Sequence, residues 1–532
     1  RYYYIAIAYS HNDYKHYNPN DPTTLDGQQK RYLASRKAAI GEVRPVEAIP
    51  HNPLPEAGGT LHYLEYGQTP EITRLDGYGN GFRGLELTTG SRDKILQDGF
   101  LDKPVYAKGG GPINVKVVDP LNLADGYFQL RFRNYTPSIS NGADTAHWTI
   151  YRYASEGGAL LDSAVSERTI GRDNEQIIPQ WGVSVQILQT NYYGPTGNVA
   201  VKKTDMISDE IAFIDSSKRW LTFVQDNSAF YPTNWIRSGT YGPTEDFVGE
   251  WNYDGSPCYQ DEVGIDDELS FSSLLDGGIA PHRLVGYQCA YMPLAYFNLP
   301  TPALSRSNSS LSFLPSVDIV LTSDKSKWTR CPVIELGKDA SLNVGQCPPG
   351  ALRKSPSVNK NGTPDGSGSG MGWFPGYAID LESGARLYMA FGENSFLGGE
   401  NGADMIWNPT DRLVSEIGAP LMGGVQPFYV FSYKQKTINN FSQGFDFPEY
   451  IPTQADNNAG NFAYQKMLEV ESNNATSKRE FYGSLTWIAY PLLRPNQQLL
   501  SSDVTIKLRV NKEYKNVTAT GLNSGRPMYG WS

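Results

Sequence analysis

Short segments that alternate apolar and polar residues, with turn residues between them, most constrain how this chain folds. Ile113, Val115 and Val117 alternate with Asn114 and Lys116 in one such segment. Further strand-like segments lie at residues 1–10, 128–132, 148–151, 183–187, 220–224, 316–322, 428–433, 485–491 and 504–510. Successive side chains of a strand point to opposite faces, so a period of two indicates strands with one buried face. Strands spaced about ten residues apart, with turns between them, are typical of β-sandwiches.

The composition favours the same fold class. The chain has 532 residues, too many for one hydrophobic core, so several domains are expected. Its 53 glycines and 35 prolines are spread along the chain, which suits short strands joined by turns. Only residues 28–40 and 266–276 indicate short helices. The prediction is a mainly β protein with several β-sandwich domains, long ordered loops and few short helices.

The segment from Gly370 to Leu413 combines Gly, Asn and acidic residues with large aromatic side chains such as Trp373, Phe391 and Trp407. A disordered acidic loop lacks such aromatics, because without buried apolar surface nothing offsets the entropy of ordering. A catalytic segment usually offers a titratable nucleophile or base, and this segment offers only carboxylates and amides. It therefore predicts an irregular but packed loop system, and it favours a scaffold or binding surface over an enzyme.

The charge and hydropathy of the chain disfavour two classes of partner. The net charge is −10 and no basic block occurs, which disfavours duplex nucleic acid as a partner. No run of eighteen apolar residues indicates a transmembrane helix. The chain opens with Arg1 in what looks like the middle of a strand, and its first residues have no signal-peptide pattern. We expect Arg1 to mark a processing site or the edge of a larger protein.

The four cysteines fit no CxxC metal pattern. Disulfides between Cys258 and Cys289 and between Cys331 and Cys347 would each close a modest loop, contributing about 3 kcal/mol. The even count and the low-charge composition favour these disulfides, as in extracellular proteins. Four free buried thiols are the alternative.

Three acidic clusters are candidates for a calcium site, because calcium takes oxygen ligands and usually a bidentate acid. Asp365 is the only carboxylate in a loop of alternating amide and carboxylate residues, 359–368. The better cluster is Glu393, Asn394, Glu400, Asn401 and Asp404. It lies next to glycines that would let backbone carbonyls turn inward towards a calcium ion. A third cluster is Asp261, Glu262, Asp266 and Asp267. Solvated acidic turns are the alternative for each cluster.

The sequence contains no convincing motif of a known enzyme class. Gly79–Gly84 matches GxGxxG, but the following Leu-Glu-Leu-Thr-Thr is strand-like, whereas a dinucleotide site needs a helix there. HExxH, GxSxG and Walker motifs are absent, and the six histidines are scattered. Carboxylate pairs for glycoside hydrolysis stay open, because their separation in space is not readable from sequence. No catalytic residues are predicted.

The segment 370–413 resembles a block that recurs in very large proteins exported by the type IX secretion system of Bacteroidota. Three more segments are similar to that family: GGPINVKVVDP at 110–120, SVDIVLTSDKSKWTRCP at 316–332 and DVTIKLRVNK at 503–512. The opening RYYYIAIAY resembles the penultimate strand of a fibronectin type III-like domain. The resemblance implies immunoglobulin- or fibronectin-like sandwiches in a protein that is secreted or held at the outer cell surface. The sorting domain that normally follows would be missing after Ser532 through cleavage or truncation.

Five regions are expected from these patterns. They are the last part of a fibronectin type III-like domain at 1–10, a loop-rich connector at 11–104, a β-sandwich at 105–205, a mixed loop-rich β domain at 206–425 and a C-terminal β domain at 426–532.

The resemblance also implies O-glycosylation, since Asp144-Thr145-Ala146 and Asp162-Ser163-Ala164 match the Asp-Ser/Thr-apolar pattern of this bacterial group. Thr145 and Ser163 are then expected on exposed turns of the sandwich.

The expected function is a non-enzymatic extracellular structural or adhesive protein, as part of a fibre, a surface layer or an adhesin. With 34 Tyr and only 19% charged residues, its surface suits extended contacts with copies of itself, other surface proteins or glycans. A secreted glycan-binding or glycan-hydrolysing protein is the alternative. Calcium is the one cofactor considered.

Overall fold

The computed structural model divides into two compact units, residues 1–65 and 66–532. It describes residues 2–4, 46–48, 64–77, 84–133, 146–170, 174–187, 207–224, 278–281, 314–336, 350–394, 399–412, 426–434, 445–471, 481 and 484–510. In the first unit, β1 (Tyr2–Tyr4) pairs antiparallel with β2 (Val46–Ala48). All further elements belong to the second unit.

Short strands make up most of the described elements of the second unit. They are β3 (Ile72–Thr73), β4 (Val105–Tyr106), β5 (Ile113–Val117), β6 (Tyr127–Arg133), β7 (His147–Tyr153), β8 (Leu160–Val165), β9 (Gln176–Ile178), β10 (Val183–Ile187), β11 (Ile207–Phe213), β12 (Leu221–Phe223), β13 (Ile279–Pro281), β14 (Val317–Leu321), β15 (Thr329–Glu335), β16 (Ala351–Leu352), β17 (Pro356–Val358), β18 (Pro364–Ser369), β19 (Met371–Phe374), β20 (Gly376–Asp380), β21 (Ala385–Leu387), β22 (Met389–Glu393), β23 (Phe428–Phe431), β24 (Leu485–Ala489), β25 (Pro491–Leu493) and β26 (Val504–Val510).

Helices are few among the described residues. They are α1 (Thr89–Asp98), α3 (Pro452–Ala455) and α4 (Phe462–Glu471), with 3₁₀ turns at Pro120–Asn122, Pro179–Trp181 and Lys325–Lys327. The fold is therefore mainly β, as predicted.

Two sheets enclose the largest core. One has five strands in the order β11-β26-β14-β20-β21, and the other has seven, in the order β13-β24-β23-β22-β15-β16 with β19 paired to β15. In β14, Val317, Ile319 and Leu321 enter the core between the sheets, while Asp318 and Val320 face the other way. The shared core includes Trp220, Cys331, Val333, Ala378, Met389, Phe391, Phe428, Val430, Trp487, Val504, Ile506 and Leu508. Burial of apolar side chains from both sheets is the main force that holds them together.

Helix α1 covers the outer face of the five-stranded sheet. Its Ile95 joins Leu85, Leu87 and Tyr106 in a core with Val320, Tyr377, Ile379 and Leu381. The Thr88 side chain accepts a hydrogen bond from Ser91 N and caps the helix N-terminus. The helix ends at Gly99, whose φ of 84° suits glycine best.

Buried charges also hold this face together. Asp318 of β14 pairs with Arg92 of α1 and, at 2.7 Å, with Arg509 of β26. Glu86 lies 3.0 Å from Arg92 and 3.1 Å from Arg509. The two acids thus bridge α1 to two strands of the sheet.

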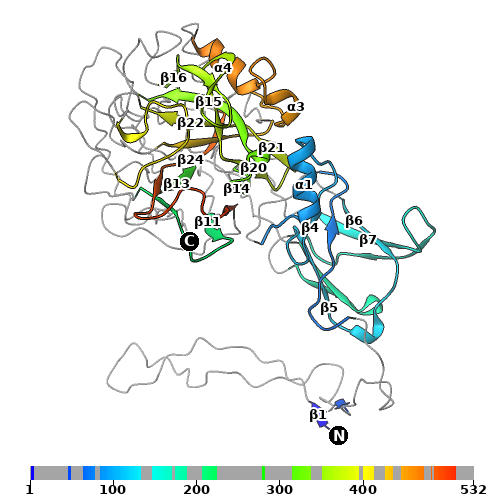
Figure 1. The fold of residues 1–532 in the computed structure, drawn as a ribbon. Helices are drawn as coiled ribbons and strands as arrows, with labels where there is room; N and C mark the ends of the chain where they lie inside the picture. Colours follow the sequence, from blue (N-terminus) through cyan, green and yellow to red (C-terminus); the bar gives the residue numbers. More distant parts are fainter. Residues whose placement is uncertain are drawn as a thin grey trace, which may run out of the picture. The chain divides into compact units, whose positions relative to one another are not determined.

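Helix α4 lies against β15 and β16 of the seven-stranded sheet, and α3 lies next to α1 (Figure 1). Ala455, Ala463 and Met467 pack there with side chains of the sheet such as Tyr388 and Tyr429. Phe431 stacks on Phe447 with ring centroids 4.3 Å apart. Both sheets of the main core are therefore covered on both faces.

The described residues 113–133, 146–170 and 174–187 form a separate small β-sandwich. Its two three-stranded sheets have the orders β5-β10-β9 and β6-β7-β8. The core between them contains Ala146, Trp148, Ile150, Ala164, Ile170, Ile178, Trp181, Val185 and Ile187. A sandwich was predicted in this region, and β10 has the predicted bounds. Its immunoglobulin- or fibronectin-like character stays a prediction.

Two predictions, one about the secondary structure of a segment and one about a domain boundary, were wrong. Residues 370–413 were expected to be irregular, yet they contain β19 to β22, whose residues are almost all buried. Strands buried on both faces have no period of two, so their pattern was missed. The domain boundary at 425/426 does not exist either, because β23 pairs with β22 and β26 pairs with β11 and β14.

Helix α1 corrects a third expectation. It lies in the region predicted as a loop-rich connector, five residues after Gly84 of the GxGxxG motif. Only Ser91 and Ile95 of this helix are buried, so its apolar pattern is too weak to be recognised. The predicted helices at 28–40 and 266–276 lie outside the described residues.

Candidate functional site

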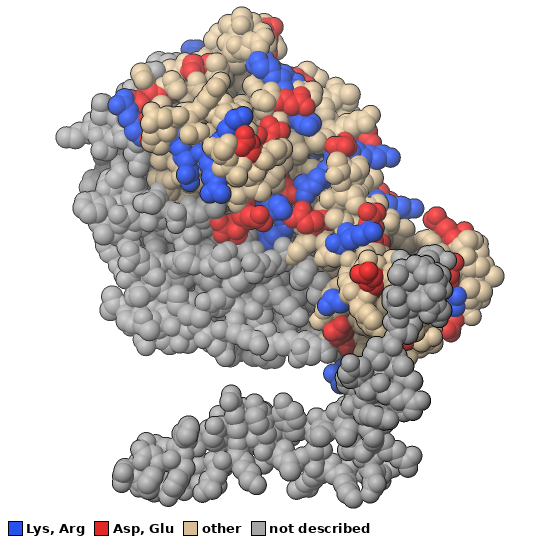
Figure 2. Space-filling model, turned by 60° about the horizontal axis from the view of Figure 1, so that its bottom comes forward, with Lys and Arg blue, Asp and Glu red and all other residues tan. Residues whose placement is uncertain are grey.

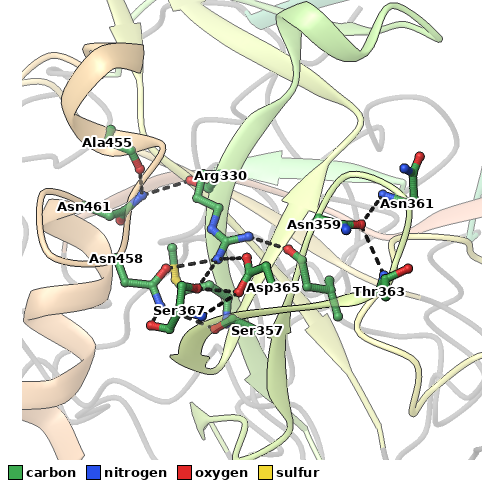
Figure 3. A network of polar contacts seen from close by, with 12 residues as sticks. Arg330, Ser357, Asn359, Asn361, Thr363, Asp365, Ser367, Ala455, Asn458 and Asn461 are labelled. Carbon is green, nitrogen blue, oxygen red and sulfur yellow. Dashed lines mark hydrogen bonds and ion pairs between the residues drawn. The ribbon is translucent and has the colours of Figure 1, made fainter.

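A polar network surrounds the buried guanidinium of Arg330 on β15, as Figure 3 shows. The guanidinium donates to Asp365 Oδ2 at 2.7 Å, to Ser367 Oγ at 2.9 Å and to Asn458 Oδ1 at 3.0 Å. It also donates to the carbonyl oxygen of Val358. These partners come from β17, β18 and the loop between α3 and α4. One arginine thus connects the hairpin to the helical layer.

The backbone of Arg330 belongs to the same network. Its N–H donates to Tyr450 Oη at 2.7 Å, and its carbonyl accepts from Asn461 Nδ2 at 3.0 Å. Tyr450 Oη in turn donates to Asp456 at 2.5 Å. Burial raises the pKa of Tyr450 well above its ordinary value. The phenol therefore stays protonated and acts as a structural donor.

Asp365, predicted as a calcium ligand, is part of this network. It lies in the β17–β18 hairpin, whose turn is closed by Asn359 Oδ1 accepting from Asn361 N and Thr363 N. Burial by itself raises the pKa of Asp365, but hydrogen bonds from Ser367 and the charge of Arg330 outweigh it and lower the pKa. Its carboxylate therefore balances the buried arginine.

A second charged cluster centres on Glu393, at the end of β22. Arg353 lies 2.9 Å from Glu393 and 3.4 Å from Glu335, and all three residues are almost fully buried. The Asp404 carboxyl also interacts electrostatically with Glu393. Burial raises the pKa of Glu393 well above its usual range, Arg353 opposes this, and the contact with Asp404 adds to it. The Glu393 carboxyl therefore holds its proton more tightly than an exposed glutamate does.

The other members of the predicted calcium cluster have separate partners. Glu400 pairs with Arg412, and Asn401 Nδ2 donates to the carbonyl of Asn408 at 2.9 Å. Asp404 also accepts from Ile406 N at 3.0 Å and from Asn408 Nδ2 at 2.9 Å. Asn394 is buried and has partners of its own.

The structure therefore brings together Glu393 and Asp404, but neither Glu400 nor Asp365 joins them. Among the residues that the structure describes, no group of three or more His, Cys, Asp or Glu side chains could hold a metal ion. Two carboxyls beside a guanidinium do not fit the six to eight oxygens that calcium takes. Calcium stays a prediction without a fitting site in this part of the chain. Asp261, Glu262, Asp266 and Asp267 lie outside the described residues.

Cys331 is a free thiol in the main core. Burial raises its pKa to about 12. The predicted disulfide with Cys347 is therefore not formed in the structure, because the Cys331 side chain faces the core between the two sheets. Cys258, Cys289 and Cys347 lie outside the described residues.

Ser163 is exposed, but it lies within strand β8 and not on a turn as expected. Its register partner on β7 is Tyr151. Accessibility is compatible with O-glycosylation, which stays a prediction. Thr145 lies outside the described residues.

Sequence reasoning missed an open cleft of about 590 Å³ that contains two arginines. It is lined by Ser216, Ser217, Arg219, Thr222, Arg494, Pro495 and Gln497. The two segments lie far apart in the chain, so no local pattern could indicate the cleft.

Exposed apolar side chains gather on the small sandwich. Of the twelve large hydrophobic residues that are exposed in the described part of the chain, seven belong to it: Leu121, Phe128, Phe132, Leu160, Leu161, Val165 and Ile177. Contiguous exposed apolar surface marks contact sites more often than single exposed residues do.

Most of the described tryptophans lie in cores. Trp148, Trp181, Trp220, Trp407 and Trp487 are fully buried. Trp373 is half-buried, with Lys360 Nζ 4.1 Å and the Arg330 guanidinium 5.3 Å from its ring centroid. Its ring is therefore engaged by cations of the protein.

Basic and acidic side chains are interspersed over the described part of the face in Figure 2. No helix within the described ranges is both long and apolar enough to cross a membrane.

No family model matches this chain. No curated protein and no solved structure shows significant similarity to it either. The functional conclusions below therefore depend on the residues and their geometry.

Proposed function

We propose that this chain is a non-enzymatic extracellular structural or adhesive surface protein, secreted by type IX export, that associates with copies of itself. The observation that carries the proposal is strand β6, which has a self-complementary sequence at the end of its sheet. The concentration of exposed apolar residues on the same small sandwich supports it.

The apolar side of β6 is incompletely covered. The β6–β7 register places Phe132 opposite Trp148 and Leu130 opposite Ile150, so the apolar side chains of β6 extend the sandwich core. Yet Phe128 and Phe132 are 40% and 48% exposed. Phe128 contacts Trp181 edge to face, with ring centroids 5.4 Å apart. A strand added beside β6 would cover these rings.

The backbone of β6 offers the same opportunity. In the order β6-β7-β8 it is a terminal strand, and no other described strand pairs with its outer edge. Such edges accept an extended segment through main-chain hydrogen bonds.

The sequence of β6, YFQLRFR, is complementary to itself. An antiparallel pair of two copies, centred on Leu130, places Phe128 against Phe132 of the copy, and Gln129 against Arg131. The remaining pair joins Tyr127 to Arg133. Aromatic pairs and amide–guanidinium pairs across strands are favourable, and no like charges lie directly opposite. A two-fold symmetric contact of this kind is the commonest route to a homodimer. The second copy is therefore the occupant that we propose for this edge.

Exchanging Gln129 and Arg131, which face each other across the proposed two-fold axis, provides the test. Gln129→Arg would place an arginine opposite Arg131 of the copy at two symmetric positions, weakening association about fivefold. The double variant Q129R/R131Q restores both pairs in exchanged positions, and we expect it to recover association. Sedimentation equilibrium on the full chain measures each constant.

A chain that stays monomeric at all concentrations would contradict the proposal, and so would a double variant as weak as the single one. Electron microscopy of native material released from cells tests the larger role, since a periodic lattice or filament is expected there.

The alternative of a secreted glycan-binding protein draws on a different observation, the cleft with Arg219 and Arg494. Its lining residues include no carboxylate. The cleft therefore supplies binding groups, and not the acid pair that glycoside hydrolysis needs.

A further inference from the structure

The cleft with Arg219 and Arg494 lies where strand β12 begins and strand β25 ends. These strands pair antiparallel, with Leu221 opposite Leu493. The chain before β12 forms a turn at 215–218, and the chain after β25 forms a turn in which Gln497 N donates to Arg494 O at 3.1 Å. The two turns form the walls of the cleft.

The buried Trp220 fixes the position of both arginines. Arg219 directly precedes it in the chain, and Arg494 N donates to the Trp220 carbonyl at 2.7 Å. The indole N–H of Trp220 donates to the Ser502 carbonyl at 2.7 Å. The backbones of both arginines are therefore anchored in the main core, while their side chains are exposed.

The charged side chains near the cleft leave the two arginines free to bind an anionic ligand. Within the described ranges, no acidic side chain forms an ion pair with Arg219 or Arg494. The adjacent acid, Asp215, pairs with Lys218 at 3.3 Å and accepts from the Ser217 hydroxyl at 2.6 Å. The hydrogen bonds from Ser217 lower the pKa of Asp215, so this carboxylate stays charged and engaged with its own turn.

The chemistry of the lining indicates the class of ligand. Two guanidinium groups favour an oxyanion such as a carboxylate or a sulfate. Ser216, Ser217, Thr222 and Gln497 add hydroxyl and amide groups, and Pro495 is the one apolar residue of the lining. A hydroxyl-rich ligand suits this surface better than an apolar one. A volume of about 590 Å³ is ample for a small ligand.

We propose that this cleft binds the carboxylate or sulfate group of an acidic saccharide, with Arg219 and Arg494 as the anion-binding residues. The inference deepens the glycan-binding alternative. It does not depend on β6 pairing, because its residues lie outside the small sandwich.

The test uses the full chain and defined polymers. Isothermal titration calorimetry is carried out with polygalacturonate, dextran sulfate, neutral dextran and poly-glutamate. The variant R219Q/R494Q removes both guanidinium groups. The matched control K108Q/K354Q removes two positive charges from exposed lysines far from the cleft residues in the sequence. Thermal unfolding of each variant verifies that the fold is kept.

We expect at least one acidic polysaccharide to bind, neutral dextran not to bind, and R219Q/R494Q to weaken binding at least about tenfold. Binding of polygalacturonate identifies a carboxylate ligand, and binding of dextran sulfate identifies a sulfate. The control variant should bind like the parent. The proposal would be overturned if neither polygalacturonate nor dextran sulfate bound, or if K108Q/K354Q weakened binding as much as R219Q/R494Q. Binding of poly-glutamate through the same two arginines would also overturn it. The Q129R series remains unaffected by these outcomes, so the two proposals can fail separately.

Discussion

The ion pair between Arg330 of β15 and Asp365 of β18, 2.7 Å long, connects the seven-stranded sheet to a hairpin and, through Asn458, to the helical layer. The arginine side chain is only 2% exposed, whereas that of Asp365 is 21% exposed. A buried cation depends strongly on its partner, because the desolvation cost of the charge persists when the partner is removed.

Asp365→Asn should therefore lower the free energy of unfolding by about 3 kcal/mol, because it leaves Arg330 without a counter-charge. Urea denaturation of the purified chain measures the change. Asp324→Asn is the matched control, since Asp324 likewise accepts from a serine N–H two residues on, but its side chain is 45% exposed. Equal effects of the two substitutions would show that the ion pair contributes nothing beyond the turn.

The pKa of Glu393 predicts a pH dependence of stability. Burial raises this pKa in the folded chain, so the folded state holds the proton more tightly than the unfolded one. The resulting stabilisation is complete below the unfolded pKa, about 4.3, and is lost as pH rises towards the folded value. Glu393→Gln should make the decline of stability above pH ~4.3 shallower.

Urea unfolding at a series of pH values measures this difference, with Glu156→Gln on an exposed turn as the control. Parallel pH profiles of the parent and the Glu393→Gln variant would refute the assignment.

Gly376 allows β14 and β20 to approach closely. A Cβ atom at this position would lie 2.0 Å from the carbonyl oxygen of Val320. Gly376→Ala should therefore cost about 2 to 3 kcal/mol, since the backbone of a packed sheet has little room to move. Gly90 in α1 has open space around its Cβ position, and Gly90→Ala should stabilise the fold by about 0.5 kcal/mol. Opposite signs in urea denaturation are the expected result.

Cys331 should be unreactive in the folded protein, because burial raises its pKa to about 12 and excludes reagents. Iodoacetamide at pH 8, followed by peptide mapping, should label Cys331 only after denaturation. Recovery of a disulfide-linked peptide that joins Cys331 to Cys347 would instead establish the bridge that the sequence alone favoured.

Local patterns in the sequence predicted much of the β structure. Strands β10 and β26 have the predicted bounds, because each has one face in a core and one face outside it. A period of two is a property of neighbouring residues, so it can be recognised without knowledge of the partners.

The tertiary structure alone decided which segments pair and where charges meet. Strand β11 (Ile207–Phe213) pairs with β26 (Val504–Val510) on the other side of the predicted domain boundary at 425/426, so that boundary was wrong. Strands β20 and β22 are buried on both faces, so their pattern carried no period that would indicate a strand.

The candidate sites follow the same division. The sequence grouped Glu393 with Asp404, and these two side chains interact in the structure, whereas Glu400 of the same group pairs with Arg412. The sequence could not show that Arg353 contacts Glu393, that Arg330 pairs with Asp365, or that Arg219 and Arg494 line one cleft. Those contacts join segments that only the burial of a common core brings together, and no rule of local spacing contains that information.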